Sequence, residues 1–325
     1  MTQRRTFLTL AGAAVAGALR PSMAWAKDFP VKPIRFVVPL AAGGSADLLA
    51  RLVGQHLSEQ WGQPVVVEMK PGGGTIIGSN LVAQAPADGY TILFSANSLV
   101  INAKLRSNLP YNGLKAFEPV ALMVTSPQVL VVNPASPWLT LGDWLQAARA
   151  QPGQRSLASL GPATTQHIAA EMLQHSTAVH LNYVPYSGGT QAVNALLGGH
   201  VDSVLCNLAE ASSHIEAGHL RPLAVTSPER LGTLTQVPTI AESGYPGFEA
   251  SAWFGVSAPA GTPQTVITRL AQGIGAAMSD PKLKHQLLAH DLQPEFLGPA
   301  DFAGHIARSY LRYSAIIDAA NITAG

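Results

Sequence analysis

Short apolar runs and segments of helical periodicity alternate through the first third of this chain. The runs at 34–38, 64–68 and 90–94 have the length and the residue types typical of strands. Between them, helices are predicted at 48–61 and 75–85, and the apolar stripe of the first is formed by Leu48, Leu49, Leu52, Val53 and Leu57. Strands that alternate with helices indicate βαβ units and a mainly parallel sheet.

The alternation resumes after an apolar stretch at 117–132, in which Ser126 and Pro127 predict a break. Strands are then predicted at 156–159, 179–184 and 201–206, and helices at 140–150, 161–174, 186–197 and 207–216. A second apolar stretch at 220–226 is interpreted as a return crossing. The rest of the chain predicts a strand at 252–258 and three helices that each begin at or next to a proline, at 263–278, 281–290 and 299–319.

Two apolar crossings that separate βα segments predict an α/β protein of two hinged lobes. We expect the first lobe to contain residues 27–124 and 223–325, with the C-terminal helices, and the second lobe to contain 125–222. Ligands of open α/β sheets bind at the carboxyl ends of the strands. Two such edges that face each other would form a cleft that closes on its ligand.

The first 26 residues have the three parts of an export signal. Arg4 and Arg5 precede an apolar stretch at 7–19 that is too short to span a membrane, and Ala24-Trp25-Ala26 fits a cleavage site. We expect cleavage near Ala26 and a periplasmic protein; the alternative is an N-terminal helix of the fold. The arginine pair suggests the Tat route, although Sec signals also contain such pairs. No cysteine stands directly after the predicted cleavage site, and no later apolar run reaches spanning length, so no membrane anchor is expected.

The charge of the chain argues against nucleic acid as a partner. The chain has 325 residues, 12% of them charged, and a formal net charge of +1. Its 20 basic residues include Arg4, Arg5 and Arg20, so removal of 1–26, which contains no acid, leaves 17 basic against 19 acidic residues and a net charge of −2. A slightly acidic protein without a basic tract is not expected to bind nucleic acid. The single cysteine, Cys206, cannot form an internal disulfide.

The loop after the first predicted strand is a candidate anion site. Gly43 and Gly44 allow backbone N–H groups to approach a ligand closely, and Ser45 is the expected N-cap of the helix that follows. Asp47 lies in the first turn of that helix, where an acidic group suits the helix dipole. A strand, a glycine turn and a helix N-terminus together can bind an anion.

Four further loops share these small residues, hydroxyl groups and helix beginnings: 95–98, 159–167, 186–190 and Asn207. No lysine or arginine lies between Arg35 and Arg51 or between Arg155 and Arg221. An anionic ligand would therefore be held by N–H groups, hydroxyls and helix dipoles, directly or through ordered water. The alternative is that glycine and serine serve only the geometry of the turns.

Motifs of catalysis and of metal binding are absent from the sequence. There is no G-x-S-x-G elbow and no phosphate-binding G-x-x-x-x-G-K-[ST] loop. The glycines of 72–78 imitate a dinucleotide-binding loop, but three residues instead of two precede the last glycine. The histidines lack the spacing of metal ligands, and we expect no metal and no cofactor. His167 is either a ligand donor or a packed or capping histidine.

Seven short motifs, in this order, are similar to those of one family: 38–47, 62–68, 87–91, 166–167, 184–186, 223–227 and 259–263. The mature chain resembles, nearly end to end, the Bug family of periplasmic solute receptors that serve tripartite tricarboxylate transporters. The resemblance implies a Venus-flytrap fold, the two-lobed, type II-like architecture of periplasmic binding proteins. It also implies a receptor without catalysis, whose partners are a small carboxylate and the membrane permease subunits of the transporter.

The resemblance also implies a set of ligand-binding residues. Family members take up di- and tricarboxylates, acidic amino acids or aromatic acids, held by the loop after the first strand and by groups of the other lobe. By position, this role would fall to Ala42, Gly43, Gly44, Ser45, Asp47, Ser159, Thr164, Thr165, His167, Tyr186, Gly188 and Asn207.

Three departures from the family pattern bear on the ligand. The family often has phenylalanine at Leu40, asparagine and glycine at Pro162 and Ala163, and aspartate at Cys206. These replacements suggest a ligand with a less polar body than citrate, such as an aromatic or an aliphatic dicarboxylate. Two other functions stay open: a sensory protein that reports the ligand to a membrane sensor kinase, and a periplasmic hydrolase or isomerase.

Overall fold

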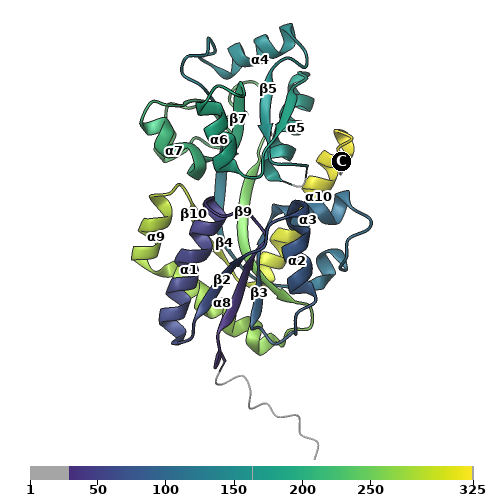
Figure 1. Cartoon of the computed structure of the whole chain (residues 1–325), viewed down its shortest axis with the longest axis vertical. Coiled ribbons are helices and arrows are strands. Elements are labelled where there is room, and N and C mark those ends of the chain that lie inside the picture. The colour runs from purple at the N-terminus through teal and green to yellow at the C-terminus, as the bar shows by residue number, and fades with distance from the viewer. Residues whose placement is uncertain (1–28, 163, 324–325) are drawn as a thin grey trace, which may run out of the picture.

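The computed structural model describes residues 29–162 and 164–323. The predicted signal peptide, 1–26, lies outside these residues. Figure 1 shows an α/β protein whose helices and strands gather in two lobes, with β4 and β9 running between them. The strands form a mixed sheet in the order β2-β1-β3-β9-β4-β7-β5-β6, while β8 and β10 pair with β4 beside this path.

The strands at one end of the sheet are parallel and are covered by helices on both faces. They are β1 (Ile34–Val38), β2 (Val65–Met69) and β3 (Thr91–Ala96). Ile34, Phe36 and Val38 point to one face, whereas Val37 points to the other. This period of two is expected of a strand. The helices on the first face are α1 (Ser45–Trp61), α8 (Gln264–Ser279) and α9 (Pro281–Leu288), and those on the second are α2 (Ile76–Ala83) and α3 (Asn97–Leu105).

The other end of the sheet repeats this layered arrangement. It contains β5 (Ser156–Ser159), β6 (Asn182–Pro185), β7 (Ser203–Asn207) and β8 (Arg221–Val225). The helices α4 (Leu141–Ala150) and α5 (Thr165–Thr177) pack on one face, and α6 (Gly189–Leu197) and α7 (Leu208–Glu216) on the other. Trp144 is the largest fully buried side chain of the first face, while Cys206 is buried in the second.

One long strand belongs to both ends of the sheet. β4 (Phe117–Val132) pairs over 117–127 with β9 (Ser251–Pro259) and over 128–132 with β7. The predicted break at Ser126 and Pro127 is therefore wrong. Pro127 lies opposite the first residue of β9 and just before the pairing with β7 begins, so the strand changes partners where the proline cannot donate a hydrogen bond.

Most predicted elements are present, and the differences have physical reasons. α10 (Pro299–Ala319) begins and ends as predicted, with a proline in its first turn. The short strand β10 (Gln293–Leu297) is not predicted by the pattern, because its existence depends on antiparallel pairing with β4. α3 is not predicted either, since its consecutive buried residues from Asn97 to Asn102 have no amphipathic period.

The N-cap of α1 also differs from the prediction. Gly44, which has extended backbone angles, is the N-cap, and Ser45 is the first helical residue; no side chain in the described part of the protein caps the helix. By contrast, Thr140 caps α4 as expected. Its hydroxyl accepts a hydrogen bond from the Asp143 N–H at 3.1 Å, and the Asp143 carboxylate accepts one from the Thr140 N–H at 2.9 Å.

The segment after β8 packs with the second lobe. Ile240, Phe248 and Ala250 lie in the same hydrophobic cluster as Trp144. The predicted lobe boundary at 222 stays a prediction, and this packing favours a return crossing at the beginning of β9. Among the described residues, no helix combines the length and the apolar character needed to cross a bilayer.

Candidate functional site

A cavity of about 540 Å³ lies between the loops of the two lobes. The first lobe contributes the loop from β1 to α1, the turn before α2, the beginning of α3 and two residues of β9. The second lobe contributes the beginnings of α5, α6 and α7. Eight of the twelve predicted ligand-binding residues line the cavity: Ala42, Gly44, Ser45, Thr164, Thr165, Tyr186, Gly188 and Asn207. Gly43, Asp47, Ser159 and His167 do not line it.

Asp47 holds the loop between β1 and α1 in shape. Its carboxylate accepts a hydrogen bond from the Gly43 N–H at 3.0 Å and another from Arg51 Nε at 2.7 Å. Gly43 has φ +83°, a conformation that glycine adopts without strain. Asp47 thus acts within its own lobe and fixes Gly43, the residue before the lining residue Gly44.

The turn before α2 is a part of the wall that the sequence did not single out as a ligand site. Thr75 has φ +80°, which is unfavourable for a β-branched residue. Its hydroxyl donates to Ser98 Oγ at 3.1 Å, and Asn102 Nδ2 donates to the Gly74 carbonyl at 2.7 Å. Strained backbone of this kind is frequent at ligand sites. The one feature of the sequence that could have indicated this part of the wall is the run of three glycines at 72–74.

Two hydrogen bonds join the lobes across the cavity. Thr190 Oγ1 donates to the Gly43 carbonyl at 3.2 Å, and Asn207 Nδ2 donates to Ser45 Oγ at 3.2 Å. The partners come from the N-terminal ends of α1, α6 and α7. These ends therefore face one another in the conformation described.

The beginnings of six helices form most of the polar wall: α1, α2, α3, α5, α6 and α7. Among the described residues, no side chain caps α1, α2, α3 or α6, whose cap residues are Gly44, Thr75, Ala96 and Gly188. The first N–H groups of an uncapped helix have no partner within that helix, and its dipole places partial positive charge there. Among the described lining residues there is no lysine, arginine or histidine. The cavity can therefore hold an anion through neutral donors.

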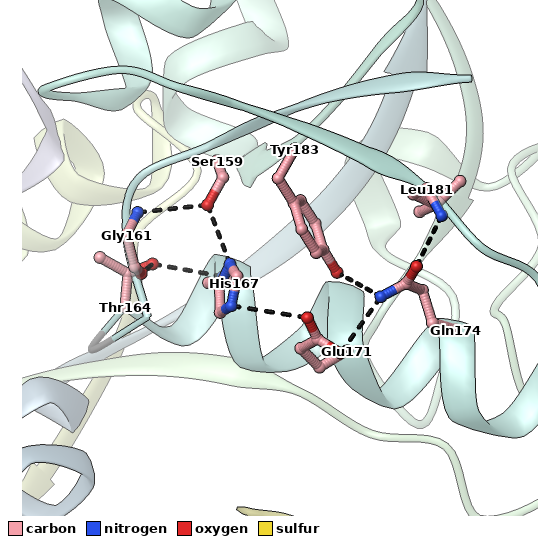
Figure 2. A network of polar contacts seen from close by, with 8 residues as sticks. All are labelled: Ser159, Gly161, Thr164, His167, Glu171, Gln174, Leu181 and Tyr183. Carbon is pink, nitrogen blue, oxygen red and sulfur yellow. Dashed lines mark hydrogen bonds and ion pairs between the residues drawn. The ribbon is translucent and has the colours of Figure 1, made fainter. Parts of the chain in front are cut away.

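Ser159 and His167 lie in a polar network within the second lobe (Figure 2). Ser159 Oγ and His167 Nδ1 are 2.9 Å apart, and His167 Nε2 lies 3.6 Å from Glu171 Oε1. The His167 ring packs on Tyr183, with 4.7 Å between the ring centres. On the other side, the Thr164 hydroxyl caps α5 by accepting from the His167 N–H at 3.2 Å. This geometry favours the packed alternative for His167.

The buried position of His167 predicts a pH dependence of stability. Burial lowers the pKa of its imidazole from 6.5, and the Glu171 carboxylate offsets only part of this effect. Below about pH 6.5 the unfolded chain binds a proton that the folded protein resists, so the free energy of unfolding should fall as the pH falls. Urea unfolding at several pH values should show a shallower acid decline for His167→Gln than for the wild type.

The control is His175→Gln, which removes an exposed histidine from the same helix. A wild-type acid decline in His167→Gln would contradict the assignment of that decline to His167.

Among the residues that the structure describes, no group of three or more His, Cys, Asp or Glu side chains is placed to hold a metal ion.

Two lobes of α/β topology around a cavity lined by helix N-termini are the architecture of a solute-binding protein. Residues 49–322 match the family described as "Tripartite tricarboxylate transporter family receptor", and the chain belongs to this family. The chain is also 35% identical over 306 residues to "Protein BugT" of Bordetella pertussis. This alignment covers 94% of this chain and 93% of that protein. The predicted resemblance to the Bug receptors is therefore confirmed, and these receptors are not enzymes.

Solved structures confirm the predicted fold class. A protein of R. palustris, "Rpa4515 with adipate", aligns with a TM-score of 0.87 and 31% identity over 91% of this chain and 99% of that one. The structure titled "MatC (Rpa3494) from Rhodopseudomonas palustris with bound malate" aligns with a TM-score of 0.84 and 27% identity over 89% and 100% of the two chains. Both neighbours were solved with small carboxylates.

Proposed function

We propose that this protein captures a small carboxylate in the cavity between its lobes and delivers it to the permease of a tripartite tricarboxylate-type transporter. The observation that carries the proposal is the meeting of six helix N-termini on one cavity without a lysine or arginine among its described lining residues. The N–H groups of the four uncapped helices among them, α1, α2, α3 and α6, can make charge-assisted hydrogen bonds to a carboxylate. The adipate- and malate-bound neighbours support the same ligand class.

Ligand capture in this proposal includes closure of the lobes about a hinge. β4 changes partners between Pro127 and Gln128, and β9 begins at Ser251 after the segment that packs with the second lobe. We therefore place the two crossings at these points instead of at 124 and 222. The hydrogen bonds from Thr190 to Gly43 and from Asn207 to Ser45 would secure the closed form.

Family membership also supports the proposed place and partner of the protein. The proposal includes export to the periplasm with removal of residues 1–26, where the arginine pair and the small-residue site are found. The ligand-loaded form would then meet the permease subunits. Transport is favoured over the sensory alternative because the matching family is described by its transporter.

Thermal unfolding of the mature protein against a panel of acids tests the proposal. The panel contains aliphatic dicarboxylates, citrate, aromatic acids, hydroxy acids and amino acids. A ligand present at 100 times its Kd should add about 2.7 kcal/mol to the free energy of unfolding and raise Tm. Adipamide, the uncharged diamide of adipate, is the matched control for the need for carboxylate. The absence of a shift with every acid would contradict the proposed function.

A further inference from the structure

Glu210 is the one charged side chain among the described residues that line the cavity. It belongs to the first turn of α7, and the sequence pattern did not mark it as a ligand residue. An acid in a site for acids is unexpected, because two carboxylates in one cavity repel each other. The position of Glu210 therefore bears on which acids the cavity accepts.

The Glu210 carboxylate lies where three helix N-termini meet. Its Oε2 accepts a hydrogen bond from the Asn207 N–H at 3.2 Å, and Asn207 Nδ2 lies 3.5 Å from Oε1. A Cβ atom placed on Gly189, at the beginning of α6, would collide with this carboxylate, and one on Gly44, at the beginning of α1, would lie 3.6 Å from Oε1. The glycine of α6 thus leaves room for the acid.

The surroundings of Glu210 leave acceptor capacity unused. Two carboxylate oxygens offer about four lone-pair positions, and the only described donors to them are the two Asn207 groups. The described residues include no ion pair to Glu210. Burial raises the pKa of the Glu210 carboxyl to about 7, and the Asn207 hydrogen bonds offset only part of this. A ligand that brings a donor would satisfy these oxygens.

We infer that Glu210 makes the cavity selective for monocarboxylates that carry a second polar group with a hydrogen-bond donor, an ammonium or a hydroxyl, over di- and tricarboxylates. This inference rests on the proposed function and narrows its ligand class. The ligand's carboxylate binds the uncapped N–H groups, and its donor end binds Glu210. A second carboxylate at that end meets the Glu210 carboxylate, whose negative charge when ionised repels it and so acts against di- and tricarboxylates.

Matched acids that differ at one end test the inference. The series on a six-carbon chain is adipate, 6-aminohexanoate, 6-hydroxyhexanoate and hexanoate, and the aromatic series is terephthalate, 4-(aminomethyl)benzoate and 4-(hydroxymethyl)benzoate. Calorimetric titration at pH 8, where Glu210 is largely ionised, measures each Kd. For the wild type, the better of the amino and hydroxy acids in a series should bind at least about tenfold tighter than the diacid.

Glu210→Gln should invert this preference, because glutamine keeps the acceptor for the Asn207 N–H but removes the charge. The diacid should gain about tenfold in affinity, and the amino acid should lose about as much. Glu216→Gln, which removes an exposed acid from the last turn of the same helix, is the matched control and should bind like the wild type.

The outcomes separate the two proposals. Preference of the wild type for the diacid, or an unchanged preference in Glu210→Gln, overturns the inference about Glu210 and leaves the proposed function standing. If neither the wild type nor Glu210→Gln binds any acid of either series or of the thermal panel, the proposed function itself fails. A matching change in Glu216→Gln would assign the effect to net charge and would also overturn the inference.

Discussion

Replacing Trp144 by alanine should lower the free energy of unfolding by about 3–5 kcal/mol. The Trp144 side chain is completely buried, in a cluster with Leu130, Leu173 and Phe248. Alanine would leave a cavity that this packed cluster cannot fill by small adjustments. Urea unfolding followed by circular dichroism measures the change, and an unchanged m-value would show that stability alone has changed.

Two further variants test whether the loss of stability comes from the buried packing of the Trp144 side chain. Leu139→Ala, at a position that is 65% exposed in the adjacent loop, should change stability by less than about 0.5 kcal/mol. Trp144→Phe should cost much less than Trp144→Ala, because phenylalanine fills most of the space and the indole Nε1 has no hydrogen-bond partner among the described residues. A loss below about 1 kcal/mol for Trp144→Ala would contradict the assigned packing.

The repeating elements could be predicted from the sequence because each depends on a local pattern. α10 was predicted residue for residue, since a proline suits its first turn and an apolar stripe runs along it. The stripe of α1 is confirmed in the same way, with Leu49, Val53 and Leu57 completely buried. The continuous β4 could not be predicted, because only its exchange of partners makes Pro127 acceptable within a strand.

The candidate site was predictable in its loops but not in its charge. Small residues and hydroxyls mark the beginnings of α1, α5 and α6, and they do line the cavity. Glu210 could not be recognised, because an acid in the first turn of a helix is ordinary in any protein. Only the fold brings α7 beside α1 and α6 and places that acid in the wall of the cavity. Thr75 could not be predicted as part of the cavity wall either, because a sequence pattern does not reveal its positive φ.

A shift of one residue in the cap of α1 has a functional consequence. With Ser45 as N-cap, its hydroxyl would accept a hydrogen bond from one of the first N–H groups of the helix. With Gly44 in that place, no side chain takes these groups, and Ser45 itself receives a hydrogen bond from Asn207 of the other lobe. The structure likewise describes no side-chain cap at α6, and the beginnings of both helices line the cavity.

Replacing Gly78 by alanine should destabilise the protein by about 1–3 kcal/mol and weaken ligand binding by about tenfold. Gly78 is buried in α2, and a Cβ there would lie 2.7 Å from Pro39 Cβ and 2.8 Å from the Lys70 carbonyl oxygen. Backbone on both sides must move to admit the methyl group. Pro39 begins the loop that lines the cavity, so its displacement should shift the beginning of α1, which lies in the wall of the cavity.

Gly54→Ala is the matched control for this substitution. Gly54 is also a buried glycine within a helix, but its Cβ would meet Val67 Cγ2 at an ordinary 3.4 Å. Both variants gain up to about 1 kcal/mol from the helix propensity of alanine, so the difference between them isolates the collision at Pro39. Urea unfolding and calorimetric titration of each variant with the strongest acid of the panel provide the comparison. If Gly78→Ala matched Gly54→Ala in stability and affinity, the close packing of α2 against the binding loop would not control the site.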